Sequence, residues 1–167
     1  MEYKNVIINR MLVKMYIYNS SIINENKIDS TIFNDMIYTG VLRIENIDLF
    51  IGYYEIDSKY NDISYGLEQL HDYEIEREVN VLILASHSGN SKISYFDDLK
   101  YLKHGDIASI YKEGLLYDYL LTDIIEISKS ENVIVDYNND ESLILITCLD
   151  DNNYLIYTFE MSNFNYY

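Results

Sequence analysis

The sequence contains no proline, a single cysteine and few basic residues, and these shortages narrow what the chain can be. One cysteine excludes an internal disulfide. The 12 basic residues stand against 28 acidic ones, which gives a formal net charge of −16. Because phosphate binding needs clustered lysine and arginine side chains, this balance argues against a nucleic-acid partner.

Long apolar runs are missing as well. No stretch of 18 or more apolar residues occurs, so no transmembrane helix, and hence no membrane anchor, is predicted within this chain. The partly apolar start is interrupted by Asn9, Arg10 and Lys14, and no small-residue cleavage site follows it. This pattern argues against a signal peptide.

What the chain does contain is enough apolar material for one compact domain, since 49% of its 167 residues are hydrophobic. Short runs rich in β-branched residues predict strands, with turn-forming segments such as 88–90 and 112–114 between them. The predicted strands cover residues 41–47, 49–56, 79–85, 106–111, 116–127, 143–148 and 154–161. Many short strands at modest spacing predict a mainly β fold, a closed or nearly closed barrel.

Helical patterns are fewer. Residues 1–18 place apolar side chains at a spacing compatible with 3.6 residues per turn, and Ser30 is a candidate cap for a short helix ending near Met36. Residues 62–71 and 95–102 also show short helical spacing. We therefore expect a helical N-terminal segment over 1–37, a β-barrel domain over 38–167, and short helices in the connections.

Two residues that end predicted strands are candidates for chemistry. Cys148 closes the apolar run 143–147, and His87 follows the apolar strand 79–85. A cysteine nucleophile needs a partner that stabilises its thiolate, and a histidinium does so and then protonates a leaving amine. The alternative is that Cys148 is a buried structural cysteine and His87 a satisfied polar residue, the ordinary case for either residue taken alone.

The acidic loops pose a separate question. Seven acidic residues are candidates for gathering a calcium ion: Glu55, Asp57, Glu74, Glu76, Glu78, Asp150 and Asp151. Their spacing is not that of an EF-hand, and solvated acidic loops are the ordinary case. We therefore assign no metal site from the sequence.

Several motifs, taken in order, resemble the sortases. The segment 40–55 (GVLRIENIDLFIGYYE) is similar to the opening strands of that family, with Glu45 where the family has a proline. Residues 82–106 resemble the family's histidine strand, its F-x-x-L stretch and its G-D turn, and 116–127 resembles the strand pair that follows. The run LILITC, ending at Cys148, matches the family's L-x-L-x-T-C signature. The resemblance covers roughly residues 38–161.

The resemblance implies a sortase-type barrel of about eight strands and a cysteine transpeptidase that needs no cofactor. Cys148 would attack a Thr-Gly-like bond in the sorting signal of a secreted protein, and His87 would act as general acid and later as base. The acyl group would pass to an amine of the cell wall or a pilin, or to water. Thr147 and Asn153 would contact the substrate, in a groove over the sheet. The family works at the extracytoplasmic face of the cell membrane, which is the localisation implied here.

One motif departs from the family. Sortases carry an arginine early in the strand after the cysteine, and in this chain Tyr154 falls at that position. Loss of an oxyanion donor typically costs about 10²–10³ in rate. The Tyr154 hydroxyl or the Asn153 amide could donate instead, or Arg43 or Arg77 could reach the site from elsewhere. Three hypotheses follow: a transpeptidase, a catalytically impaired peptide-binding module of the same fold, or an unrelated acidic β-domain.

Overall fold

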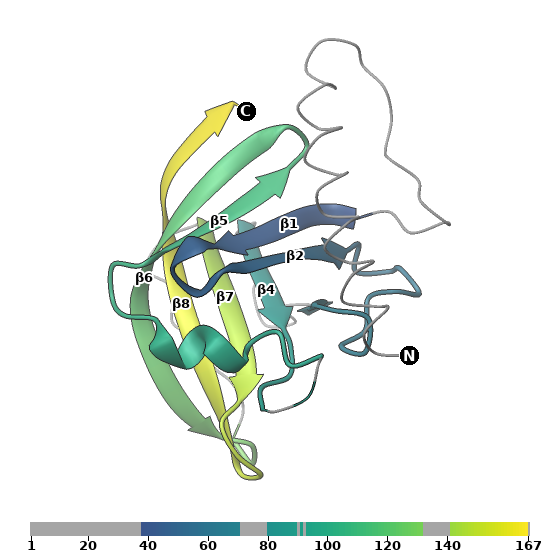
Figure 1. Ribbon diagram of the computed structural model, residues 1–167, viewed down its shortest axis with the longest axis vertical. Coiled ribbons are helices and arrows are strands. Elements are labelled where there is room, and N and C mark those ends of the chain that lie inside the picture. Colours follow the sequence, from purple (N-terminus) through teal and green to yellow (C-terminus); the bar gives the residue numbers. More distant parts are fainter. Residues whose placement is uncertain (1–37, 71–79, 90, 92, 132–140, 167) are drawn as a thin grey trace.

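The computed structural model describes residues 38–70, 80–89, 91, 93–131 and 141–166 (Figure 1). The predicted N-terminal helical segment over 1–37 lies outside these residues, so the domain boundary at 37/38 stays a prediction. Arg77 also lies outside them. Within them, eight strands form one sheet. They are β1 Tyr38–Ile44, β2 Leu49–Tyr54, β3 Glu68–Leu70, β4 Asn80–Ala85, β5 Ile107–Lys112, β6 Leu115–Ser128, β7 Glu141–Cys148 and β8 Asn153–Tyr166.

The strand order in the sheet is β2-β1-β5-β6-β8-β7-β4-β3. An isolated bridge between Tyr53 of β2 and Leu67, just before β3, links the two outer strands. The sheet therefore curls into a nearly closed barrel, and the prediction of a mainly β, sortase-type barrel of about eight strands is confirmed. All named strand pairs are antiparallel except β4 and β7.

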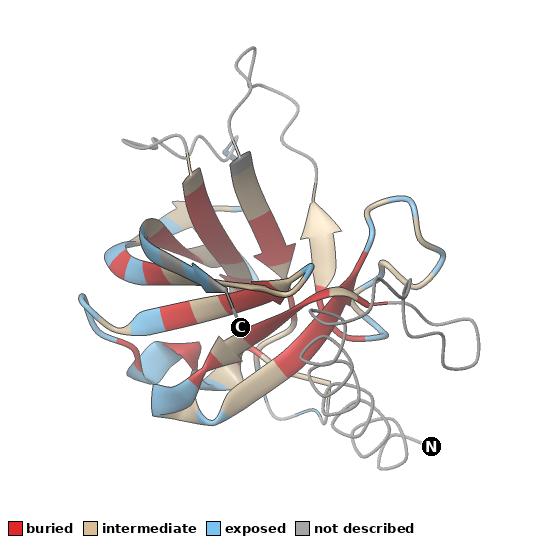
Figure 2. Cartoon of the chain, turned by 90° about the horizontal axis from the view of Figure 1, so that it is seen from above, coloured by how far each residue is buried: buried red, intermediate tan, exposed pale blue. Residues whose placement is uncertain are grey.

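Alternation of side chains along the strands separates two apolar layers. The barrel interior takes alternate residues of every long strand, such as Leu143 and Leu145 of β7 and Tyr157 and Phe159 of β8. The intervening residues form a second, isoleucine-rich layer on the outer face, with Ile144 and Ile156 at its centre. Figure 2 shows the buried residues recurring along the strands.

Two short 3₁₀ helices lie in the connections, η1 Glu45–Ile47 and η2 Asp97–Tyr101. The second confirms the short helix predicted near 95–102, and its residue Leu99 is fully buried in the core. The first replaces the last residues of the predicted strand 41–47. The turn predicted at 112–114 is present between β5 and β6, where Glu113 and Gly114 have φ angles of 53° and 78°.

The helix predicted over 62–71 is wrong in the part that the structure describes. Asp62 starts a turn in which its carboxylate accepts from Ser64 N at 2.8 Å, and Gly66 has a φ angle of 153°, which a helix does not allow. Residues Glu68–Leu70 then pair with β4 as strand β3. The apolar spacing that suggested a helix comes from a buried loop residue, Leu67, followed by a short strand.

Candidate active site

His87 and Cys148 lie at the carboxyl ends of the neighbouring strands β4 and β7. The two strands run parallel, and the register pairs Ala85 with Ile146 (Figure 1). The pairing continues past β4, because Ser86 N donates to Ile146 O at 3.2 Å. Continued by two pairs beyond Ala85 and Ile146, this register sets His87 beside Cys148, with both side chains on the outer face of the sheet. Neither residue could be placed beside the other from sequence separation alone.

Side-chain bonds fix the two backbones relative to each other. The Thr147 hydroxyl donates to Ser86 O at 3.0 Å, and the Ser88 hydroxyl donates to Cys148 O. Thr147 is only 4% exposed, so this bond is inside the protein. Thr147 thus ties β7 to β4 directly before the cysteine. This contact is structural, and the contact of Thr147 with substrate stays a prediction.

His87 is also tied to the connection that follows it. Phe96 N donates to His87 O at 3.1 Å, and Phe96 is 1% exposed in the barrel core. Gly89 N donates to the carboxylate of Asp97 in η2 at 3.0 Å. Because the loop after His87 is bonded at both of these points, the imidazole is carried by an anchored segment. Cys148 and His87 are both half-buried, in contrast to the fully buried cysteine of the structural alternative.

Tyr154 lies directly beside Cys148 on the other side. The antiparallel register of β7 and β8 pairs Cys148 with Tyr154, and Tyr154 in turn pairs with Ile127 of β6. Directly opposed residues present their side chains on the same face of a sheet. His87, Cys148, Tyr154 and Ile127 therefore form one transverse line across four strands, which we call the active-site row.

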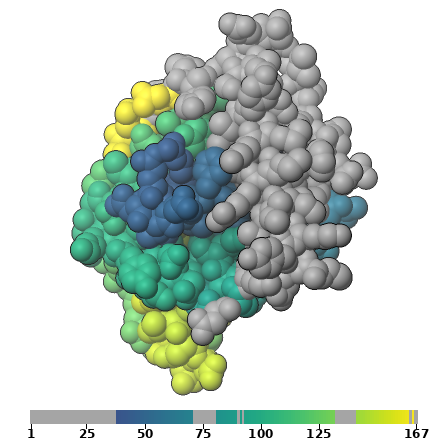
Figure 3. All heavy atoms as spheres, viewed as in Figure 1, coloured from purple at the N-terminus to yellow at the C-terminus, as the bar shows by residue number. Residues whose placement is uncertain are grey.

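Asn153 is directed elsewhere. Its side-chain amide donates to Glu126 Oε1 at 2.8 Å, and its backbone N donates to Asp150 Oδ1 at 2.8 Å. It precedes Tyr154, so alternation places it on the opposite face of β8. Of the two donors considered from sequence, the structure brings Tyr154 to Cys148 and holds Asn153 in the β7–β8 turn. Figure 3 shows this turn (yellow-green) projecting at one end of the molecule.

Sequence reasoning missed Lys129, which lies just beyond β6. Its ammonium nitrogen is 5.1 Å from the centre of the Tyr154 ring and donates to Asp150 O at 2.8 Å. Its backbone N donates to Asn152 O at 2.7 Å. A positive charge thus stands over the tyrosine that occupies the arginine position. No local motif marks Lys129, because only the β6–β8 pairing brings it there.

Asp62 is a second residue that the sequence did not single out. The hydrogen bonds from Ser64 lower the pKa of the Asp62 carboxyl, and the charge of His87 adds a smaller effect in the same direction. Nearby, the Ser86 hydroxyl donates to Gly66 O at 3.4 Å. The turn that starts at Asp62 is therefore on the His87 side of the row.

Arg43 is engaged far from the row. It belongs to β1, where its guanidinium donates to the Tyr111 hydroxyl at 2.9 Å and pairs with Glu45. Strands β5, β6 and β8 separate β1 from β7 in the sheet. The structure thus does not bring Arg43 together with Cys148.

An apolar layer, most of it buried, continues from the row along the outer face. Ile146 precedes Cys148 on the same side of β7, and Ile156 follows Tyr154 on the same side of β8. They belong to the outer isoleucine layer with Ile83, Ile125 and Ile144. Ile83, Ile144 and Ile156 are buried, whereas Ile125 and Ile146 are partly exposed.

Neither a metal cluster nor a spanning helix is found within the described ranges. No three histidine, cysteine, aspartate or glutamate side chains there are grouped to hold an ion. No helix in those same ranges has the length and apolar character needed to cross a membrane.

Comparison with known proteins gives one family. Residues 42–159 match the Sortase domain family. Among solved structures, Listeria monocytogenes sortase A aligns with a TM-score of 0.64 at 18% identity, over 78% of this chain and 90% of that one. A Clostridium perfringens sortase D5 transpeptidase aligns with a TM-score of 0.64 at 16% identity, over 97% and 98%. Streptomyces coelicolor sortase E1, solved with a tripeptide in its active site, gives 0.64 at 16%, over 77% and 90%. The search of curated proteins gave no match. At these identities the structural likeness establishes a shared fold.

Proposed function

This chain belongs to the sortase family, and from that premise we propose that it is a cysteine transpeptidase acting on the sorting signals of secreted proteins. The observation that carries the proposal is the parallel register of β4 and β7, which supports placing His87 beside Cys148. The site would work at the extracytoplasmic face of the membrane, where the family's substrates emerge.

The reaction uses the thiol of Cys148 together with the imidazole of His87 beside it. The Cys148 thiolate, paired with the His87 imidazolium, attacks the carbonyl carbon of a Thr-Gly-like peptide bond. His87 gives its proton to the leaving amine, and a thioester remains on Cys148. An incoming amine of the cell wall or a pilin then attacks the thioester and loses a proton to His87. The thiolate leaves, and a new amide bond has formed.

Tyr154 takes the position from which the developing oxyanion is stabilised. Its place opposite Cys148 and on the same face supports this role. A hydroxyl donor contributes a neutral hydrogen bond, and the Lys129 ammonium at its ring adds positive charge nearby. The partly exposed Ile125 and Ile146 of the outer isoleucine layer support binding of the peptide, and Thr147 holds the cysteine strand in register.

The proposal is tested with a panel of peptides that each contain a Thr-Gly bond in a different flanking sequence. Triglycine and Nα-acetyl-lysine serve as amine acceptors. We expect an acyl adduct on the wild-type chain by intact mass, a ligated product with acceptor, and neither with Cys148→Ala. Absence of adduct and product across the whole panel would refute the assignment as a transpeptidase.

The second candidate is a peptide-binding module of the same fold with impaired catalysis. The occupation of the arginine position by Tyr154 favours it, because a tyrosine brings no formal charge. This candidate predicts that peptides bind equally to wild type and Cys148→Ala by calorimetry while no product forms. Ligated product from the purified wild-type chain rules it out.

A further inference from the structure

The barrel interior opens, at the end remote from Cys148, into a cavity of about 310 Å³. Its walls include Leu82 and Ile110 from the core and six polar side chains: Tyr53, Gln69, Lys112, Tyr117, Tyr119 and Glu141. Glu141 is the first residue of β7 and Cys148 the last, so the length of the strand separates Glu141 from the active-site row. The cavity volume is at the lower end of the range typical of small-molecule sites.

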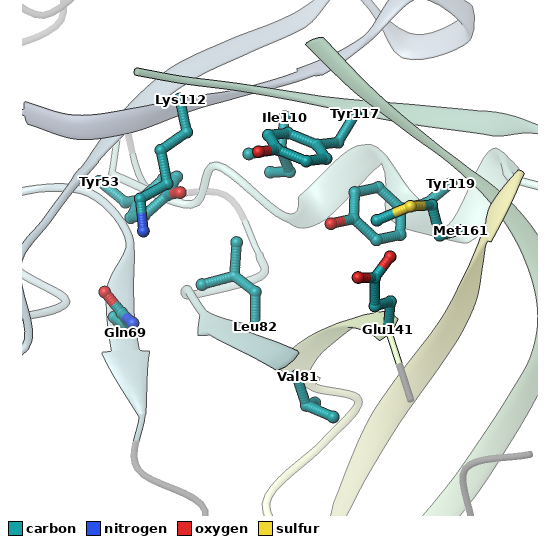
Figure 4. Close-up of a pocket in the computed structure, with 10 residues that line it drawn as sticks. All are labelled: Tyr53, Gln69, Val81, Leu82, Ile110, Lys112, Tyr117, Tyr119, Glu141 and Met161. Atoms are coloured by element: carbon teal, nitrogen blue, oxygen red, sulfur yellow. The ribbon is translucent and has the colours of Figure 1, made fainter. Parts of the chain in front are cut away.

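Two side chains of opposite charge point into this cavity, because side chains alternate between the two faces of a strand. Glu141 precedes Leu143 and Leu145 on the interior face of β7, and Lys112 follows Ala108 and Ile110 on the interior face of β5. Figure 4 shows Lys112 on one side of the cavity and Glu141 on the other, with Leu82 between them. Both side chains are half-buried.

Among the described residues, the side chains of Lys112 and Glu141 have no ion-pair or hydrogen-bond partner. Charges that are partly withdrawn from water without a partner carry a desolvation cost. A ligand that brings a carboxylate to Lys112 and an ammonium to Glu141 would offset that cost at both ends.

Gln69 supplies an independent sign of a missing ligand. Its side-chain oxygen Oε1 is buried and accepts no hydrogen bond from any residue that the structure describes. The backbone is held firmly, since Gln69 N donates to Asn61 Oδ1 at 2.6 Å and Asn61 Nδ2 donates to Gln69 O at 2.9 Å. An orphaned acceptor of this kind is unusual in a folded protein, and a ligand N–H is a suitable donor for it.

Tyr119 lines the same part of the cavity as Glu141. Burial raises the pKa of its hydroxyl to about 12, and the Glu141 carboxylate contributes in the same direction. The hydroxyl therefore stays protonated at neutral pH, and its ring is available to an ammonium group held by Glu141.

We propose that this cavity binds a small zwitterion with a free amino group and a free carboxyl group, of roughly dipeptide size. The carboxylate pairs with Lys112, the ammonium pairs with Glu141, and a backbone N–H of the ligand donates to Gln69 Oε1. The apolar side chain lies against Leu82 and Ile110. The proposal is independent of the transpeptidase assignment, because it concerns the opposite end of the barrel.

The test uses glycyl-leucine as probe, followed by amide chemical shifts of the full chain carrying Cys148→Ala. That substitution prevents any reaction of the probe's amine at the active site. We expect saturable shifts at Lys112, Tyr119 and Glu141. N-acetyl-glycyl-leucine, which lacks the ammonium, and glycyl-leucinamide, which lacks the carboxylate, should each bind at least about tenfold more weakly, as expected for loss of one charged hydrogen bond.

Matched variants test which side chain binds the carboxylate of the ligand and which binds its ammonium group. Lys112→Met should abolish the preference for glycyl-leucine over its amide, and Glu141→Gln the preference over the acetylated form. Lys100→Met, at a surface lysine paired with Asp97, is the control and should change neither. Gln69→Met should weaken binding while leaving the stability of the free protein unchanged or higher, because it removes an unsatisfied acceptor. No saturable shifts, shifts confined to the active-site row, or equal binding of the three probes would each overturn the proposal.

Discussion

The two ends of the β4–β7 pair are made by the same strands and carry different chemistry. At the carboxyl end, His87 and Cys148 are on the outer face, flanked by Tyr154 and an isoleucine layer. At the amino end, Glu141 is on the interior face and points into the barrel cavity with Lys112. One end presents a histidine and a cysteine outward, and the other presents two charged side chains inward that are unpaired among the described residues. A single pair of strands can therefore support two sites with no residue in common.

The largest expected effect is on the ligation rate, for substitutions within the active-site row. Cys148→Ala should abolish acyl adduct formation, and His87→Ala should lower the rate of ligation by about 10²–10⁴, because the proton transfers lose their donor and acceptor. Ligation is followed by mass spectrometry. Glu141→Gln, at the other end of β7, serves as control and should leave the rate within about twofold. A rate that falls equally in Glu141→Gln would contradict the independence of the ends.

The next largest effect concerns the oxyanion position. Tyr154→Phe removes only the hydroxyl, and we expect kcat to fall by about 10² with little change in KM if that hydroxyl stabilises the oxyanion. The thermal midpoint provides the control, since the ring and its contact with Lys129 remain. An unchanged kcat would assign oxyanion stabilisation to another group.

A smaller effect should follow from the bond that holds the strands in register near Cys148. Thr147→Val keeps the shape but leaves Ser86 O without its buried donor, so the free energy of unfolding should fall by about 1–3 kcal/mol. Urea unfolding measures this change. Thr122→Val is the matched control, because Thr122 is exposed and its hydroxyl donates to Thr158 O at 3.2 Å; we expect about 0.5 kcal/mol or less. Equal losses in the two variants would argue against a special role for Thr147.

At the cavity end, the expected signature is a pH dependence. The pKa of Tyr119 is raised to about 12 in the folded chain, above the ordinary value of 10.0. Its contribution to stability is therefore fully present below pH 10 and is lost as pH rises toward 12, because the unfolded state releases its proton first. Comparing urea unfolding of wild type and Tyr119→Phe between pH 9 and 12 isolates this part from the other buried tyrosines. Parallel curves for the two proteins would contradict it.

The smallest effect is expected for Lys129. Its side chain is exposed, so the charge at the Tyr154 ring is screened by solvent. Lys129→Gln should lower the ligation rate about two- to fivefold, whereas Lys129→Arg should preserve it. Mass spectrometry of the ligated product measures the rate. Equal rates for the Gln variant and wild type would contradict a role of Lys129 in the site.

The sequence predicts those parts of the fold that depend on local pattern. Strands β4 and β7 follow from continuous runs of valine, leucine and isoleucine, and the β5–β6 hairpin follows from Glu113 and Gly114. Strand β3 was missed because its three residues have no pattern of their own and are made a strand by pairing with β4. Local periodicity instead suggested a helix there.

The site divides in the same way. The residue types at His87 and Cys148 follow from motifs, and the pairing of Tyr154 with Cys148 follows from a short turn between antiparallel strands. The place of Lys129 depends on the long pairing of β6 with β8, and that of Asp62 on a turn packed beside β4. These contacts join residues distant in sequence, so local sequence patterns do not predict them.

The half-buried thiol at the end of β7 also gives this protein a built-in reporter. Because Cys148 is the only cysteine in the sequence, a thiol-reactive spin label or fluorophore attaches at one known position without any mutation. The eight residues of β7 span about 23 Å from that position to Glu141. That separation is within range of distance measurements between the label and a ligand carrying a second probe in the barrel cavity, so occupancy of one end can be observed from the other.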